Sequence, residues 1–111
     1  MNPTAPPPAP VPRVLQPTEI VGRMAQCPGW MLDGDGPSVA IRRTVRFEDF
    51  PRAMAFANAV AYACQRLAHP PSLEIEATAC TVRFRTPSAG GITAADFAAA
   101  AQVDLLLAEP A

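Results

Sequence analysis

The chain has 111 residues, of which 50% are hydrophobic and 17% charged, and its formal net charge at pH 7 is −1. This length accommodates one small domain with little surplus core, so an oligomer is a reasonable expectation. The near-neutral charge balance argues against nucleic-acid binding through bulk positive charge. No apolar run approaches the ~20 residues that a bilayer-spanning helix needs, and no segment indicates a membrane surface.

The three cysteines, Cys27, Cys64 and Cys80, include no CxxC pair. An odd number without paired spacing predicts reduced, packed thiols in a cytoplasmic protein. A zinc site made of these thiols and the single histidine would need short paired spacings that the chain lacks. We therefore expect neither a metal nor a cofactor.

The first twelve residues, MNPTAPPPAPVP, contain six prolines and little apolar bulk. Proline cannot donate to a β-ladder, so we expect a disordered or polyproline-II tail over residues 1–14 and one domain over 15–108. The stretch lacks the basic start and apolar core of a signal peptide. The tail is either a solvated extension or a docking segment for another protein.

A helix and a hairpin are expected next. Residues 17–26 predict a short helix with Pro17 in its first turn. Residues 30–32 and 38–47 predict two strands joined by DGDG, a strong turn signal. The second strand alternates apolar and polar residues, which indicates that one of its faces is buried.

The longest periodic segment, residues 48–68, predicts a helix that Asp49 can cap and that Pro70 and Pro71 end. Its apolar positions cover more than the one side that a sheet would bury. We therefore expect a second protein surface on this helix, with a homodimer favoured. One stripe at helical spacing comprises Phe50, Met54, Ala57, Val60, Ala61, Cys64 and Leu67, and it is widened by Phe56, Ala59 and Tyr62.

Two more strands, at 72–77 and 79–85, and a final helix at 92–107 complete the chain. Thr93 and Asp96 have the spacing of a capping box. The order α-β-β-α-β-β-α predicts a single α+β domain in which three helices pack on one face of a four-stranded antiparallel sheet. The strand residues expected to face inward include Leu73, Ile75, Val82 and Phe84.

The opposite face of this sheet carries charged side chains that can pair across neighbouring strands. Such a face is either simply solvated or a contact surface for a partner protein. The candidate partner-binding residues are Arg42, Arg46, Glu74, Glu76, Arg83 and Arg85.

This arrangement and four short landmarks resemble the pterin-4a-carbinolamine dehydratase family over roughly residues 15–107. The resemblance implies a site with an acidic residue and two histidines near the end of the long helix, a third histidine after the last strand, and an aspartate in the final helix. Dehydration of a carbinolamine protonates a leaving hydroxyl and removes a ring proton, work that suits imidazoles. The landmarks are PGW at 28–30, FEDFPRAMAFANAVA at 47–61, AHP at 68–70 and GGITAADFAAAA at 90–101.

The chain departs from that pattern at the positions that matter for acid–base chemistry. Cys64 stands where the acidic residue is expected, Ala68 replaces the first histidine, and Pro87 takes the place of the third. A general acid or base typically contributes ~10²–10⁴-fold, and the chain has only one histidine, so we expect that it is not an enzyme. The vestigial pocket that the resemblance implies comprises Cys64, Ala68, His69, Pro70, Thr86, Pro87 and Asp96.

His69 itself has three interpretations. The favoured one is a residue at the end of a helix, whose partial positive charge complements the terminal carbonyl groups. The others are a ligand-binding role in a leftover pocket and true catalysis.

Family members without the histidines include pterin-dehydratase-like proteins regarded as RuBisCO assembly factors of the α-carboxysome. The resemblance to that subgroup implies a non-catalytic assembly factor that binds RuBisCO subunits, in the cytoplasm and associated with the carboxysome. One alternative is a weak 4a-hydroxytetrahydrobiopterin dehydratase that uses His69 and Asp96. The other is a dimerisation cofactor of a transcription factor, which would not contact DNA itself.

Overall fold

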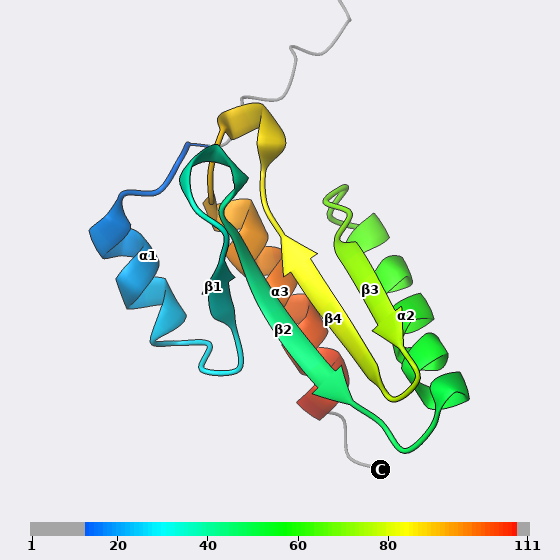
Figure 1. The fold of residues 1–111 in the computed structure, drawn as a ribbon. Helices are drawn as coiled ribbons and strands as arrows, with labels where there is room; N and C mark the ends of the chain where they lie inside the picture. Colours follow the sequence, from blue (N-terminus) through cyan, green and yellow to red (C-terminus); the bar gives the residue numbers. More distant parts are fainter. Residues whose placement is uncertain (1–12, 109–111) are drawn as a thin grey trace, which may run out of the picture.

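The structure is a computed structural model and describes residues 13–108. In it, four strands form one antiparallel sheet that is accompanied by three α-helices (Figure 1). This is the predicted α+β fold, and every predicted helix and strand is present. The order of the strands across the sheet is β1-β2-β4-β3. The strands are β1 (Met31–Asp33), β2 (Ala40–Arg46), β3 (Ser72–Glu76) and β4 (Ala79–Phe84), and the helices are α1 (Pro17–Met24), α2 (Phe50–Gln65) and α3 (Ala94–Ala108).

The proline-rich tail expected over 1–14 lies outside the described residues, apart from its last two positions. Val14 forms an antiparallel bridge with Thr93, and Leu15 is buried in the core. The folded part therefore includes Val14, one residue before the expected domain boundary at 15. Within residues 13–108 no helix combines the length and the apolar character needed to cross a bilayer.

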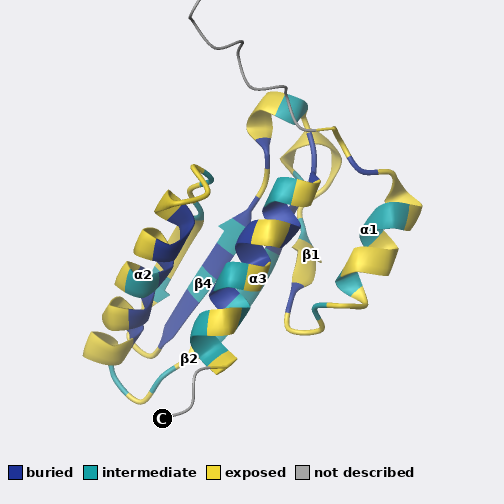
Figure 2. Cartoon of the chain, turned by 180° about the vertical axis from the view of Figure 1, so that it is seen from behind, coloured by how far each residue is buried: buried dark blue, intermediate teal, exposed yellow. Residues whose placement is uncertain are grey.

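The two faces of the sheet differ in their cover. Helices α2 and α3 lie over one face (Figure 2), where Ile41, Val82 and Phe84 are fully buried. Over the other face the described residues place no helix. Helix α1 lies beside α3, at the β1 end of the sheet (Figures 1 and 2), and has no fully buried residue. Of the three helices predicted to cover one face, α2 and α3 therefore make the principal contacts with the sheet.

Local signals fix the start and the end of α2. Asp49 caps the helix by accepting a hydrogen bond of 2.9 Å from the backbone N–H of Arg52, as predicted. Ala68 follows the helix with φ +51°, in the left-handed region, which reverses the chain direction before Pro70 and Pro71.

The buried side of α2 differs in part from the predicted stripe. Ala57, Val60 and Cys64 are buried as expected, because they face the sheet and α3. Phe50, Met54, Ala61 and Leu67 were expected in the same stripe but are exposed. Leu73, expected to face inward, is also exposed, since β3 is an edge strand that only α2 covers. The complete set of buried α2 residues is Ala53, Phe56, Ala57, Val60, Ala63 and Cys64.

Candidate functional site

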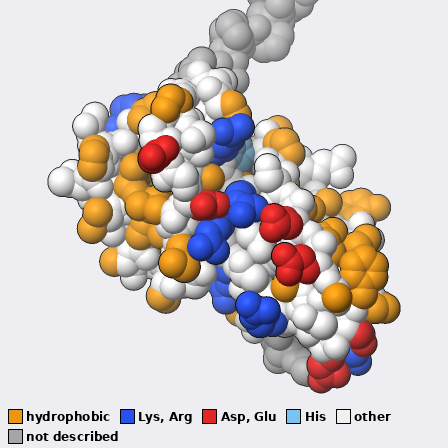
Figure 3. All heavy atoms as spheres, in the orientation of Figure 1, with side chains coloured by type: hydrophobic (Ala, Val, Ile, Leu, Met, Phe, Trp, Pro, Cys, Tyr) orange, Lys and Arg blue, Asp and Glu red, His pale blue; other side chains and the backbone are white. Residues whose placement is uncertain are grey.

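A pocket of about 530 Å³ lies at the end of the sheet where β4 meets the turn between β1 and β2. Its walls come from that turn, from the 3₁₀ turn Pro87–Ala89 that follows β4, and from the segment that leads from α2 into β3. His69 is the only pale-blue side chain in Figure 3, where it lies in a hollow beside arginine side chains. The pocket thus contains the segment that carries the chain's one imidazole.

The side chain of His69 points across the sheet toward α3. Its Nε2 lies 2.5 Å from Oδ1 of Asp96, and its ring stacks on Phe84 with the two centroids 5.9 Å apart. The left-handed conformation of Ala68 produces this direction by turning the chain back at the end of α2. The interpretation that the His69 side chain complements the carbonyl groups at the helix end is therefore wrong, because the side chain bonds to Asp96 instead. The backbone N–H of His69 does donate to the carbonyl of Cys64, at 3.4 Å.

Asp96 is the centre of a directed hydrogen-bond network. Its side chain is fully buried, and its Oδ2 accepts from the hydroxyl of Thr86 at 3.0 Å and from the backbone N–H of Thr93 at 2.9 Å. Since the Thr86 proton is directed to Asp96, the Thr86 oxygen accepts from the hydroxyl of Thr93, 2.8 Å away. The Thr93 oxygen accepts in turn from the N–H of Ala95. The predicted capping box forms in part: the Asp96 carboxylate accepts from the N–H of Thr93, whereas the Thr93 hydroxyl oxygen accepts from the N–H of Ala95 and not from that of Asp96. Asp96 also holds His69 and Thr86.

This network fixes which atom of His69 is free. A carboxylate can only accept, so the ring nitrogen that faces Asp96 carries its proton as a donor. The other nitrogen, Nδ1, is the one that a ligand could reach, because the side chain of His69 is 14% exposed. The pocket therefore offers one imidazole nitrogen for binding or for proton transfer.

The other positions of the vestigial pocket do not replace the missing imidazoles. Cys64 is buried, and burial raises the pKa of its thiol, which leaves it protonated near neutrality. It lines a second pocket, of about 470 Å³, beside Leu73 and Ala68. Pro87 lines the first pocket but has no titratable group.

A charged cluster on the open face of the sheet adjoins the pocket. Asp33 accepts a hydrogen bond of 2.6 Å from Nε of Arg83, and the same oxygen lies 3.7 Å from Nε of Arg42. The hydrogen bond from Arg83 lowers the pKa of Asp33, and that bond in turn raises the pKa of Arg83. Sequence reasoning missed Asp33, because its place in DGDG was interpreted only as a turn signal.

The six candidate partner-binding residues are not a single network. Glu74 lies 3.9 Å from Arg83, which is the one predicted pairing of opposite charges that forms. Arg85 lies one residue beyond the end of β4 but lines the pocket with Arg83. Arg46, Glu76 and Arg85 have no ion pair within the described part of the chain. Among residues 13–108, no three side chains of His, Cys, Asp or Glu are grouped so that they could hold a metal ion.

The protein belongs to the pterin-4-alpha-carbinolamine dehydratase family, whose family model matches residues 13–106. A relative in Paracidovorax citrulli, named "Putative pterin-4-alpha-carbinolamine dehydratase", is 44% identical over 86% of this chain and 83% of its own length. A relative of the same name in Chloroflexus aggregans is 37% identical over 84% of this chain and 96% of its own length.

Two solved structures share the fold. One is a transcriptional coactivator/pterin dehydratase from Brucella melitensis, with a TM-score of 0.77, 24% identity, and coverage of 85% of this chain and 98% of that one. The other is a pterin dehydratase-like protein identified as a RuBisCO assembly factor in the α-carboxysome. It has a TM-score of 0.60, 19% identity, and coverage of 74% of this chain and 93% of that one.

Proposed function

We propose that the protein is a non-catalytic member of its family that acts by binding another protein, as an assembly factor for RuBisCO. The observation that carries the proposal is the state of the single imidazole, whose Nε2 is held by the buried Asp96. Dehydration of a carbinolamine needs one group to protonate the leaving hydroxyl and another to take the ring proton. One free nitrogen cannot hold both places at the same time.

The rest of the pocket supports the same conclusion. Its remaining titratable lining groups are Asp33, Arg83 and Arg85. Arg83 lowers the pKa of Asp33, so this carboxylate is a poor base at neutral pH. The two guanidinium groups remain protonated and cannot accept a proton. No pair of groups in the pocket is suited to exchange protons with a pterin.

A role in protein binding is supported by the surface around α2 and β3. Phe50, Met54, Leu67 and Leu73 are exposed there, although large apolar side chains are normally buried. Apolar patches of this kind mark protein interaction sites. A second copy of the chain would cover part of this surface, in the homodimer that the sequence led us to expect.

RuBisCO as the partner is supported by analogy, since a protein with the same fold is described as its assembly factor in the α-carboxysome. The test is co-expression of this chain with the large and small subunits of an α-carboxysomal RuBisCO. We expect more assembled enzyme on a sizing column than without the chain. The Leu105→Lys variant is the matched control, because Leu105 is exposed on α3 and lines neither pocket, and it should assist assembly as well as the parent chain does. No gain in assembled enzyme would contradict the proposed partner.

A second function, weak dehydratase activity, is favoured by one specific observation. His69, Asp96 and Thr86 form an ordered network at the pocket wall, with Nδ1 of the imidazole free. If Nδ1 both gives and takes the proton in successive steps, turnover would be slow and would disappear in His69→Ala.

A further inference from the structure

Two arginines of one strand line the pocket together. Arg83 and Arg85 are two residues apart at the end of β4, a spacing that places both on the same face of a sheet. We infer that this pocket binds a carboxylate side chain, Asp or Glu, on an acidic segment of the partner protein. The inference rests on the proposed function, because the acidic segment belongs to a protein partner.

The structure already shows a carboxylate bound to one of these arginines. Asp33 lies 2.6 Å from Nε of Arg83, and the same Asp33 oxygen is the nearest carboxylate to Arg42. Within residues 13–108, Glu74 is the only other acidic side chain that pairs with Arg83, at 3.9 Å, and it is more than half exposed. The half-buried Asp33 carboxylate is thus shared by two guanidinium groups, and Glu74 is a second, more exposed partner of Arg83.

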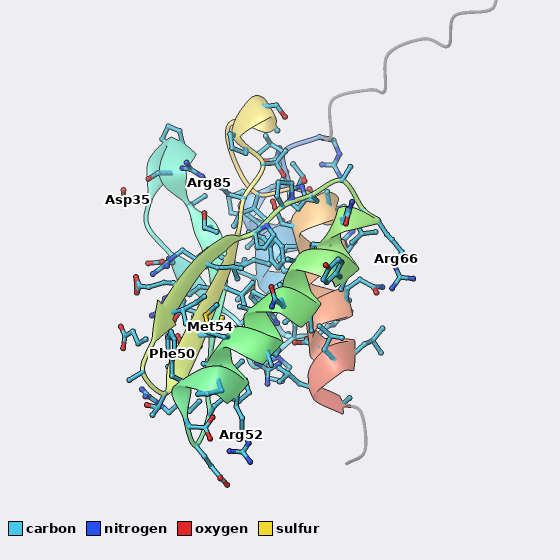
Figure 4. The ribbon with its side chains drawn as sticks, turned by 90° about the vertical axis from the view of Figure 1, so that its right-hand side faces the viewer. Asp35, Phe50, Arg52, Met54, Arg66 and Arg85 are labelled. Atoms are coloured by element: carbon cyan, nitrogen blue, oxygen red, sulfur yellow. The ribbon has the colours of Figure 1, made fainter. Side chains whose placement is uncertain are left out.

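Arg85 supplies the second positive group. It is exposed and forms no ion pair within residues 13–108. Asp35 lies at the same end of the molecule in Figure 4 but does not line the pocket. Of the acidic and arginine side chains that line the pocket, two are therefore arginines, Arg83 and Arg85, and one is a carboxylate, Asp33.

The uncharged groups of the pocket are also suited to an acceptor ligand. Ser72 and Ser88 line it, together with His69. Two other lining hydroxyl groups are already engaged: Ser38 donates to the backbone carbonyl of Asp35 at 2.9 Å, and Thr86 donates to Asp96. An arginine-rich wall with free hydroxyl donors matches a carboxylate, whose two oxygens only accept.

The setting of the pocket favours a peptide as the carrier of this carboxylate over a small free anion. The pocket opens beside the helix-free face of the sheet, and the charged side chains of that face continue from it along β2 to Arg46. A surface of this kind can contact a chain longer than one ligand group. Complementary charge at exposed positions mainly sets specificity and the rate of association.

The experiment is fluorescence anisotropy of fluorescein-labelled hexaglutamate with the full chain at low salt. Hexaglutamine with the same label is the neutral control. We expect hexaglutamate alone to bind, and Arg85→Gln to weaken binding about fivefold. Arg66→Gln is the matched control, because Arg66 is exposed at the end of α2, outside the charged sheet face, and does not line the pocket. It should leave binding unchanged. Asp33→Asn should tighten binding, since it frees Arg83.

Three results would overturn the inference: equal binding of the two peptides, equal losses in Arg66→Gln and Arg85→Gln, or full displacement of the peptide by millimolar inorganic phosphate. The last result would identify a small-anion site instead.

The RuBisCO co-expression assay separates this inference from the proposed function. If the parent chain raises assembly but hexaglutamate does not bind, the pocket inference alone is wrong. If hexaglutamate binds as expected but assembly does not rise, the pocket stands and the proposed partner is wrong.

Discussion

Replacement of Asp96 by alanine should destabilise the protein strongly, because Asp96 accepts three hydrogen bonds of a buried network. The substitution leaves the N–H of Thr93, the hydroxyl of Thr86 and Nε2 of His69 without an acceptor. Each buried, unpaired group costs about 1–3 kcal/mol, and relaxation of the site recovers part of the sum. We expect a loss of about 3–5 kcal/mol in the free energy of unfolding, as for the breaking of other buried pairs. Domains of this kind are stable by about 5–15 kcal/mol in total.

Two milder substitutions separate the network from the loss of volume. Asp96→Asn keeps the shape of the side chain. Its amide oxygen can still accept from Thr86 and Thr93, and its NH₂ group can donate to Nε2 of His69 once the imidazole changes tautomer. We expect a cost of about 1 kcal/mol. His69→Ala removes one donor at a partly exposed position where water can replace it, and should cost about 1–2 kcal/mol.

Urea unfolding followed by the fluorescence of Trp30 measures all three variants. Trp30 is the only tryptophan, it is 3% exposed, and its Nε1 donates to Asp104 at 2.9 Å, so its emission reports loss of the core. The expected order of cost is Asp96→Ala, then His69→Ala and Asp96→Asn. The reasoning would be refuted if the free energy of unfolding of Asp96→Ala lay within about 1 kcal/mol of that of the parent chain. It would also be refuted if Asp96→Asn lowered this free energy as much as Asp96→Ala does.

Three further predictions follow from the packing and the charges. Burial raises the pKa of the Cys64 thiol. At mildly alkaline pH an alkylating reagent should therefore label the half-buried Cys27 first and Cys64 only after unfolding in urea. Equal labelling rates for the two thiols would contradict the packing. Because its arginine partner lowers the pKa of Asp33 in the folded state, this carboxylate stabilises the fold above its unfolded pKa of about 4. The stability difference between the parent chain and Asp33→Asn should therefore be constant at higher pH and vanish as the pH falls through the folded-state pKa; a difference that grows in acid would show the opposite sign. Met54→Lys should convert the expected dimer to a monomer in sedimentation equilibrium, because Met54 lies on the proposed contact surface. The control variant Leu105→Lys, on α3, should remain a dimer. A parent chain that is already monomeric would contradict the dimer.

Local signals in the sequence predicted the elements and their ends. Asp49 and the pair Thr93–Asp96 mark helix starts through residues three positions apart, and the structure confirms the first cap and part of the second. The alternation in β2 correctly placed Ile41 on the buried face. These features depend on neighbours in the chain, so a single sequence contains them.

Features that depend on distant segments were predicted less well. The direction of His69 is set by the left-handed Ala68 and by Asp96, 27 positions further on. Asp33 meets Arg83 across 50 positions, and no local pattern relates the two. The buried side of α2 shifts from the expected stripe because α3 and the sheet together select it, and periodicity alone does not say where each will lie.

The measurement that tests the central claim most directly is the turnover of a 4a-carbinolamine substrate by the purified protein at neutral pH. We predict the same rate for the parent chain, for His69→Ala and for buffer alone, because the pocket offers a single free imidazole nitrogen where the reaction needs two proton-carrying groups. Turnover above the uncatalysed rate by the parent chain, lost in a folded His69→Ala variant, would show that the protein is a dehydratase.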